Sequence, residues 1–298
     1  MKNSDKNPRF AFFGTPDRAV IALETLNKSG IKPALVVTQP DRPQGRKLAL
    51  TPPPAKVWAL KENVPVLQPE NLNDGAFLDT LRKGGFDFFV VVAYGKIFSQ
   101  NILDIPKYGC INLHASLLPH LRGSSPVETA VLTDDRNTGA TVILMDNQMD
   151  HGPIILQEPA TIPKWPLPAD DLAKILVEKG GELLVRAMRG IMSGEIKPAE
   201  QNHSEATFTK KISKEDGAID LAADPYKNFL KYNAYKGWPG IHFFVEHSGK
   251  KIRVNITEAA FENGAFVVKK VIPEGKKETT WQAFNQNLTS SSSSKADL

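Results

Sequence analysis

The sequence predicts an α/β protein: a Rossmann-like domain built on a mostly parallel sheet, followed by a small β-rich domain. Short apolar runs alternate with helical patterns through the first two-thirds of the 298 residues, which is typical of a sheet covered by helices on both faces. The run at 87–94 is apolar on both faces, as a central parallel strand is. After Gly194 the helical patterns give way to a polar stretch and then to strand-like segments.

The strands are predicted from short runs of β-branched and aromatic residues bounded by glycine, proline or polar residues. They cover 9–15, 34–39, 87–94, 109–115, 139–146 and 153–161. The helices are predicted from apolar residues at helical spacing, as at Val20, Leu23 and Leu26 in the helix that begins at Asp17. The other helices expected in this part cover 54–61, 74–83, 126–133 and 170–192.

The last third of the chain is predicted to form a separate, smaller domain. Residues 194–211 are polar and have little periodicity, which is typical of a linker. A short helix with Pro225 near its start follows, and then strands at 240–247, 250–259 and 264–272. We therefore expect a first domain at 1–195, a linker at 196–212 and a β-rich domain at 213–288. The serine-rich tail at 289–298 is of low complexity, and we expect it to be disordered.

Composition narrows the class of protein. The longest apolar run, 88–93, is too short to span a bilayer, and the first residues lack the apolar core of a signal peptide. The single cysteine, Cys110, excludes an internal disulfide and a cysteine-built metal site. The net charge of +4 is a mild excess that favours a polyanionic partner. We expect a cytoplasmic monomer with no membrane association and no obligate protein partner.

One predicted strand carries two polar side chains in an otherwise apolar run. Residues two apart in a strand point to the same side, so Asn112 and His114 share one face, and Ile111 and Leu113 share the other. The polar pair stands at the carboxyl end of the strand, which is where open α/β sheets bind ligands. The alternative is that both side chains only satisfy backbone groups of the following loop, but the pairing favours a functional role.

A carboxylate that orients and charges the histidine is expected on the loop between the strands at 139–146 and 153–161. Asp146 and Asp150 flank that loop, and Asp150 precedes the turn sequence His151-Gly152-Pro153. Asp150 is our candidate, with a plain turn aspartate as the alternative. His151 is expected to be a solvent-exposed turn residue.

These motifs resemble a known family. The segment "INLHASLLPHLRG" (111–123), followed by "MDHGPIILQ" (149–157), resembles the folate-dependent formyltransferases. The segments "FFGTPDRA" (12–19), "VVTQPDRPQGR" (36–46) and "VAYGKI" (92–97) narrow the resemblance to the branch that formylates methionyl-tRNA. The resemblance extends from Phe10 to about Phe284.

The resemblance implies an activity and a role for each polar residue. The enzyme would transfer a formyl group from 10-formyltetrahydrofolate to the amino group of initiator methionyl-tRNA, in support of translation initiation. Asn112 would donate to the tetrahedral oxyanion, and His114 would stabilise the same oxygen and shuttle a proton. Asp150 would favour the imidazolium form of His114 and accept the amine's proton through a water. The chemistry needs no covalent nucleophile and no metal, and Cys110 is expected to be a small core residue.

The resemblance also implies two binding regions. The folate would lie against the loop after the polar strand and the segment after the strand at 87–94, with the loop at 147–150 closing the far side. The residues concerned are Ser116, Leu117, Leu118 and Pro119 in the first, and Lys96, Ile97 and Phe98 in the second.

The proline-rich loop at 38–56 would enter the acceptor end of the tRNA, with Arg42 approaching the bases and Arg46 and Lys47 the phosphates. A solvated surface loop is the alternative for this segment. The family's second domain is usually a fuller OB-like barrel, whereas this chain passes almost directly from an early strand to the last one. The resemblance therefore implies a shortened barrel.

Three other functions are alternatives to this one. An N-formyltransferase that acts on an amino sugar nucleotide would share Asn112, His114 and Asp150; the loop "PDRPQGR" argues against it, and the shortened second domain argues slightly for it. A nucleotide-binding oxidoreductase is disfavoured because "GTPDRA" lacks the G-x-G-x-x-G spacing that lets a backbone approach a pyrophosphate. A tRNA-binding protein with an inactive enzyme domain is disfavoured because all three catalytic residue types are present.

Overall fold

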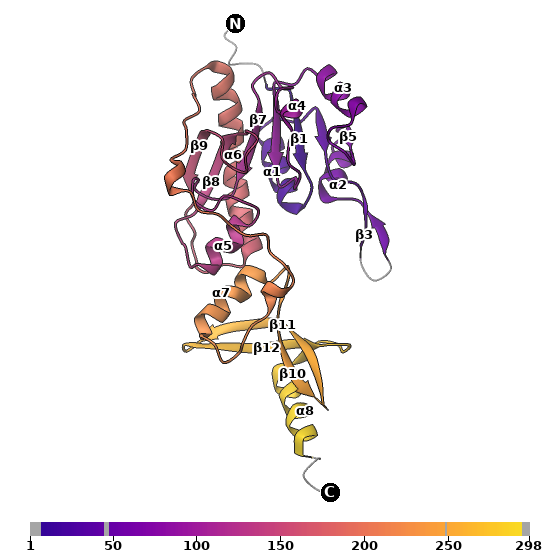
Figure 1. Cartoon of the computed structure of the whole chain (residues 1–298), viewed down its shortest axis with the longest axis vertical. Coiled ribbons are helices and arrows are strands. Elements are labelled where there is room, and N and C mark those ends of the chain that lie inside the picture. Colours follow the sequence, from indigo (N-terminus) through magenta and orange to yellow (C-terminus); the bar gives the residue numbers. More distant parts are fainter. Residues whose placement is uncertain (1–6, 45–47, 248, 294–298) are drawn as a thin grey trace. The chain divides into compact units, whose positions relative to one another are not determined.

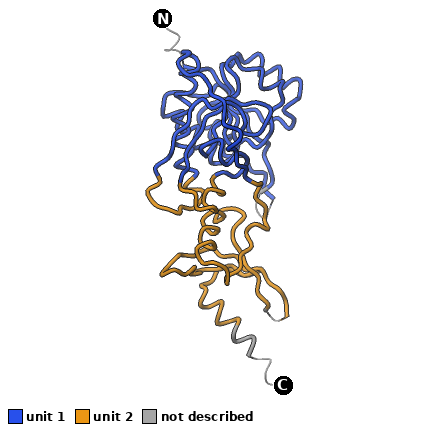
Figure 2. The backbone as a smooth tube through the Cα atoms, turned by 60° about the vertical axis from the view of Figure 1, so that its left-hand side comes forward, with its two compact units in different colours: residues 1–126, 137–161, 173–209 blue, residues 127–136, 162–172, 210–298 orange. Residues whose placement is uncertain are grey.

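The computed structural model describes residues 7–44, 48–247 and 249–293. The chain divides into two compact units (Figure 2). Unit 1 comprises residues 1–126, 137–161 and 173–209, and unit 2 comprises residues 127–136, 162–172 and 210–298. Among the described residues, no helix has the length and apolar character needed to cross a membrane.

Unit 1 is built on a seven-stranded sheet with the strand order β5-β2-β1-β6-β7-β8-β9 (Figure 1). The first five strands in that order run parallel, and β8 and β9 are antiparallel to their neighbours. This arrangement confirms the predicted mostly parallel, Rossmann-like sheet. The strand bounds are β1 (Phe10–Gly14), β2 (Leu35–Val37), β5 (Val66–Leu67), β6 (Phe88–Val92), β7 (Cys110–His114), β8 (Gly139–Leu144) and β9 (Ile154–Pro159).

Helices cover both faces of this sheet because its strands are apolar on both faces. One core packs α1 (Asp17–Lys28), α2 (Pro54–Lys61) and the later part of α6 (Ala169–Ser193) against β1, β6 and β7. A second core packs α3 (Gly75–Lys83) and α4 (Gln100–Leu103) against the opposite face. The side chain of Asp74 begins α3 by accepting a hydrogen bond from the Phe77 amide at 2.9 Å, which satisfies one of the amides left unpaired at a helix N-terminus.

The strand β7 divides its side chains between the two faces as its alternation predicts. Ile111 and Leu113 belong to the core that lies under α6, where a Cβ on Gly180 would stand 2.2 Å from Leu113 Cδ1. Glycine at that point allows the helix to approach the strand closely. Cys110 lies in the second core, 1% exposed, and burial raises the pKa of its thiol. It is a core residue, as the sequence analysis expected.

The segment predicted as a loop at 38–56 contains a small hairpin. Its strands are β3 (Arg42–Gln44) and β4 (Ala49–Thr51), paired antiparallel. Asp41 precedes the hairpin and accepts hydrogen bonds from Lys56 Nζ at 2.7 Å and Gln68 Nε2 at 2.7 Å. Those bonds hold the pKa of the Asp41 carboxyl below its usual value. Arg46 and Lys47 lie outside the described residues.

The polar segment after α6 has a defined place in unit 1. The backbone of Ala199 exchanges hydrogen bonds with Ile154 of β9 at 2.7 and 2.8 Å, and residue 208 forms a parallel bridge with residue 122. A short 3-10 helix, His203–Glu205, lies between these contacts. The sequence predicted a linker here because single bridges leave no periodic apolar pattern to read.

Unit 2 is formed by α5 (Pro126–Leu132) from Val127 onward, the start of α6 and the end of the chain. A 3-10 helix (Glu215–Gly217) and α7 (Pro225–Tyr235) precede an antiparallel sheet with the order β10-β11-β12-β13. Its strands are β10 (Ile241–His247), β11 (Lys250–Glu262), β12 (Ala265–Pro273) and the two-residue β13 (Thr279–Thr280). The first three of these strands were predicted from the sequence, and β13 was not.

Among the described residues, two α-helices were not predicted from the sequence: the four-residue α4 and, near the end of the chain, α8. The helix α8 runs from Trp281 to Ser293 and so enters the serine-rich tail that was expected to be disordered. Rings of Trp281 pack against Phe243 and Phe284, with centroids 5.8 Å apart in each pair. Once a first turn is anchored by such packing, adding further residues to a helix costs little, even for serine.

We expect Gly139→Ala to destabilise the protein by about 1–3 kcal/mol, the usual cost of overpacking a buried site. An added Cβ would stand 2.3 Å from the Glu158 carbonyl oxygen and 2.6 Å from Leu117 Cδ2. The matched control is Gly75→Ala at the first position of α3, where nothing lies within 4 Å of the added Cβ. The urea midpoints of the two variants and the wild type measure the difference, and equal midpoints would contradict the packing described for β8 and β9.

Candidate active site

The three predicted catalytic side chains meet at the carboxyl end of β7. Asn112 Nδ2 donates to Asp150 Oδ1 at 3.3 Å, and His114 Nδ1 lies 3.5 Å from Asp150 Oδ2. The side chains of His114 and Asp150 are 5% and 13% exposed. The carboxylate therefore stands between an amide and an imidazole, in a place with little access to water.

A backbone carbonyl fixes the orientation of the histidine ring. His114 Nε2 lies 2.9 Å from the carbonyl oxygen of Leu121. A carbonyl only accepts hydrogen bonds, so Nε2 must carry a proton. The nitrogen that faces Asp150 is then Nδ1, and it can donate only when the ring holds a proton on both nitrogens.

Asp150 is held in an uncommon backbone conformation, with φ at +50°. The Gly123 amide donates to its Oδ2 at 2.8 Å, which aims the carboxylate. Two residues later, Gly152 passes so close to β8 that an added Cβ would stand 1.9 Å from the Leu144 carbonyl oxygen. The sequence Asp-His-Gly therefore allows a sharp return toward β9 that brings the carboxylate back over β7.

The other carboxylate of the loop has a different partner. Asp146 Oδ2 lies 2.6 Å from Nδ1 of His151, whose ring stacks on that of His203 with centroids 4.0 Å apart. His151 was expected to be a solvent-exposed turn residue, but its side chain is only 27% exposed. Within the described residues, Asp150 is the carboxylate in ion-pair contact with His114.

The loop after β7 is fixed by hydrogen bonds to its backbone. Ser116 is 1% exposed, and its hydroxyl donates to the His120 carbonyl at 2.7 Å. Thr141 Oγ1 donates to the Ser116 carbonyl at 2.6 Å, and Gln157 Nε2 donates to the Leu118 carbonyl at 2.7 Å. Leu118 is 3% exposed, whereas Leu117 and Pro119 are half-buried. Of the four predicted folate-binding side chains in this loop, two are thus turned into the protein.

The three side chains of the second predicted folate-binding segment, residues 96–98, differ in their contacts and exposure. Lys96 Nζ donates to the carbonyls of Pro69 and Glu70 at 3.0 and 2.7 Å. Ile97 is 80% exposed, and Phe98 is 3% exposed and packs on Phe13 at 4.9 Å between centroids. Burial lowers the pKa of Lys96, and the charge of Arg42 lowers it further. The exposed guanidinium of Arg42 is therefore close enough to act on this segment.

The structure adds residues to the site that the sequence analysis did not name. Leu121 and Gly123 contact His114 and Asp150 through their backbones. Gln201 contacts the turn that carries Asp150. A backbone contact leaves no signal in a single sequence, and Gln201 stands in a polar stretch that resembles a linker. No group of three or more His, Cys, Asp or Glu side chains that could hold a metal occurs in the described part of the chain.

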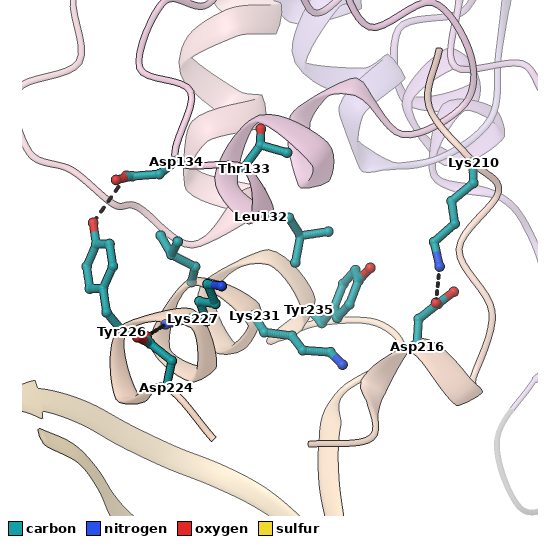
Figure 3. Close-up of a pocket in the computed structure, with 11 residues that line it drawn as sticks. Leu132, Thr133, Asp134, Lys210, Asp216, Asp224, Tyr226, Lys227, Lys231 and Tyr235 are labelled. Atoms are coloured by element: carbon teal, nitrogen blue, oxygen red, sulfur yellow. Dashed lines mark hydrogen bonds and ion pairs between the residues drawn. The ribbon is translucent and has the colours of Figure 1, made fainter. Parts of the chain in front are cut away.

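Unit 2 contains a cavity of its own, with a volume of about 790 Å³ (Figure 3). Lysine and aspartate side chains line it together with two tyrosines. Tyr226 donates to Asp134 Oδ1 at 3.1 Å, and Lys210 forms an ion pair with Asp216. Because three lysines and three aspartates are among the residues that line it, the cavity shows no clear preference for a cation or an anion.

Comparison with known proteins identifies the family. The family model described as formyl transferase matches residues 8–188. The methionyl-tRNA formyltransferase of Chloroflexus aurantiacus is 42% identical over 264 residues, which are 89% of this chain and 84% of that protein. The methionyl-tRNA formyltransferase of Desulfotalea psychrophila is 35% identical over an alignment of 306 positions, which covers 95% of this chain and 94% of that protein.

Solved structures show the same fold. The methionyl-tRNA formyltransferase from Clostridium thermocellum has a TM-score of 0.60 at 14% identity and covers 89% of this chain and 98% of that one. A 4-N formyltransferase from Francisella tularensis has a TM-score of 0.60 at 21% identity and covers 82% of this chain and 96% of that one. The structures support the fold, and the sequence matches extend over both units. The chain belongs to the methionyl-tRNA formyltransferase family.

Proposed function

We propose that this protein transfers a formyl group from 10-formyltetrahydrofolate to the amino group of initiator methionyl-tRNA, in support of translation initiation. The observation that carries the proposal is the convergence of Asn112, His114 and Asp150 at the carboxyl end of β7. The sequence matches to methionyl-tRNA formyltransferases over most of the chain support this choice of acceptor.

Formyl transfer requires a negative charge to be stabilised and two protons to be moved. The amine attacks the formyl carbon, and the carbonyl oxygen becomes an oxyanion. The amine nitrogen then loses a proton, the bond to the folate nitrogen breaks, and that nitrogen gains a proton. Asn112 uses one of its two amide hydrogens on Asp150 Oδ1, which leaves the other to donate to the oxyanion.

The remaining two residues complete the proton balance. With Nε2 donating to Leu121, a doubly protonated His114 can give its Nδ1 proton to the leaving folate nitrogen and end as the neutral ring that still satisfies Leu121. Asp150 accepts the amine's proton through a water. The proton then returns from Asp150 to His114 over the 3.5 Å between Oδ2 and Nδ1. Neither residue needs to change its backbone position during the cycle.

The residues after β6 and β7 have the chemistry to hold the folate. These strands are neighbours in the sheet and parallel, so the segments that follow them leave the sheet at the same edge. Leu117 and Pro119 are half-buried and Ile97 is exposed, so these apolar side chains are accessible to a ligand. The backbone of the loop after β7 is fixed by the hydrogen bonds described above. A flat ring system would pack on them and hydrogen-bond to loop backbone groups. The folate supplies the formyl group as a co-substrate.

The hairpin after β2 supplies positive charge for the acceptor. Arg42 is exposed on β3, and its charge acts on Lys96. Two cationic side chains near the carboxyl ends of β2 and β6 would attract the phosphates at the acceptor end of a tRNA. Arg46 and Lys47 belong to the same proposed contact, although they lie outside the described residues.

Asn112→Ala should lower kcat by about 10²–10³-fold, the usual loss for one oxyanion donor. His114→Ala should lower kcat at least as much, because it also removes the proton donor to the folate nitrogen. Single-turnover formylation of initiator methionyl-tRNA measures both, with circular dichroism as the control for folding. Near-wild-type turnover in either variant would contradict the assignment.

Asp150→Asn should slow formylation far more than Asp146→Asn. The first removes the carboxylate that faces His114, whereas the second removes only the partner of His151. The two substitutions are matched, since both replace a carboxylate by an amide on the same loop. If the order of the two rates were reversed, the wrong carboxylate would have been assigned.

Arg42→Ala should reduce kcat/KM for initiator methionyl-tRNA while leaving the affinity for tetrahydrofolate nearly unchanged. If the Arg42 guanidinium contacts phosphate alone, its loss should weaken the binding of all tRNAs equally and reduce the salt dependence of binding. If it contacts a base edge, its loss should also change the discrimination between tRNAs by about 1–3 kcal/mol. Formylation of initiator and elongator methionyl-tRNA at two salt concentrations measures this. Unchanged kinetics in a triple variant with Arg46→Ala and Lys47→Ala would instead favour an amino sugar nucleotide as acceptor, which can be assayed directly.

A further inference from the structure

Arg122 is a buried cation with neutral partners. It is 3% exposed. Its Nη2 donates to Gln201 Oε1 at 2.6 Å and lies 2.8 Å from His203 Nδ1, and its Nε donates to Gln201 Oε1 at 3.2 Å. The contacts described for this guanidinium include no carboxylate. Burying a charge on neutral acceptors is costly, so the arrangement calls for a reason other than stability.

Gln201 links that cation to the catalytic turn. The residue is 5% exposed, and its Oε1 accepts both bonds from Arg122. Its Nε2 donates to the carbonyls of Asp150 at 2.9 Å and Gly152 at 2.7 Å. All its hydrogen-bonding capacity is used, and the reversed amide would set oxygen against two carbonyls and NH₂ against a guanidinium. The glutamine therefore has a single satisfactory orientation.

The segment that carries Arg122 also touches both catalytic side chains. Leu121 accepts from His114 Nε2, and Gly123 donates to Asp150 Oδ2. The same segment is bonded to Thr207, whose carbonyl accepts from the Arg122 amide at 2.8 Å and whose hydroxyl accepts from the Leu121 amide at 2.8 Å. The backbone of this segment thus contacts the Asp150 carboxylate directly, and its Arg122 side chain is connected to the Asp150 carbonyl through Gln201.

Asp150 needs such support because its backbone is left-handed, with φ at +50°. A non-glycine residue persists in that region only where its surroundings hold it there. The two carbonyls that Gln201 binds flank His151, so one side chain fixes both ends of the turn. A small rotation of that turn would change the distance between the Asp150 carboxylate and His114.

We infer that Gln201, held by Arg122, is a positioning residue that sets the Asp150 carboxylate against His114 for formyl transfer. The inference rests on the proposed function and deepens it. Gln201 touches no reacting atom, and it acts through the backbone of the turn. Loss of its two donors should lower kcat by about 10–100-fold, the range expected when a reacting group is misplaced by about 1 Å. KM for both substrates should change less than about threefold.

Gln201→Glu separates positioning from structural support. The glutamate keeps an acceptor for Arg122 and adds a charge that suits the guanidinium, so stability should be at or above that of Gln201→Ala. It cannot donate to the Asp150 and Gly152 carbonyls, so kcat should stay as low as in Gln201→Ala. A purely structural role predicts the opposite, a recovery of kcat together with stability. His203→Phe is the matched control, because it removes the other Arg122 acceptor, keeps a ring to stack on His151 and leaves both donors of Gln201 in place.

The experiment measures kcat, KM and the thermal midpoint of the wild type, Gln201→Ala, Gln201→Glu and His203→Phe, with 10-formyltetrahydrofolate and initiator methionyl-tRNA. Low kcat in both Gln201 variants and near-wild-type kcat in His203→Phe support the inference. Wild-type kcat in Gln201→Glu overturns it.

A crystal structure of Gln201→Glu tests the inference without the reaction. The Asp150 carboxylate should move away from His114, and an unchanged turn would overturn the inference. If the wild type formylated no methionyl-tRNA, the proposed function would fail, and the crystal structure would still decide whether Gln201 holds the turn.

Discussion

The carboxylate of Asp150 connects the β8–β9 turn to residues that lie 27 to 38 positions earlier in the sequence. It accepts from the side chain of Asn112 and from the backbone of Gly123, and it lies 3.5 Å from the ring of His114. A nearly buried carboxylate needs several donors to remain charged. The end of β7, the loop that follows it and the β8–β9 turn are all arranged to supply them. If any of these elements shifted, the charge would lose a donor and the site its geometry.

Most of the described contacts of the Asp150 carboxylate are with neutral groups. Two of its contacts, an amide side chain and a backbone N–H, are neutral, and only the imidazole can change its charge. The buried guanidinium of Arg122 is bound to the neutral side-chain amide of Gln201, which in turn contacts the backbone of Asp150. Within the described contacts no cation is paired permanently with Asp150, as the proposed proton transfer requires. A permanent ion pair would instead oppose protonation of the carboxylate.

Apolar packing positions this polar site. Ile111 and Leu113 bury one face of β7 under α6, so the residues between and after them must face the other way. A shift of one residue in register would bury Asn112 and His114 under the helix and expose two aliphatic side chains. The site is therefore specified by the same hydrophobic pattern that specifies the sheet.

The sequence by itself determined the parts of this protein that depend on local periodicity. Alternation fixed β7 and the shared face of Asn112 and His114, and helical spacing fixed α1, α2 and α6, because these patterns repeat within a few residues. Tertiary structure alone decided which polar residues meet. It paired Asp146 with His151, turned Ser116 inward, and brought Gln201 to the turn that carries Asp150 from a stretch without periodicity. It also continued α8 into the serine-rich tail. Contacts of this kind join distant residues such as Arg122 and Gln201, which are 79 positions apart, and a pattern read along the chain carries no record of them.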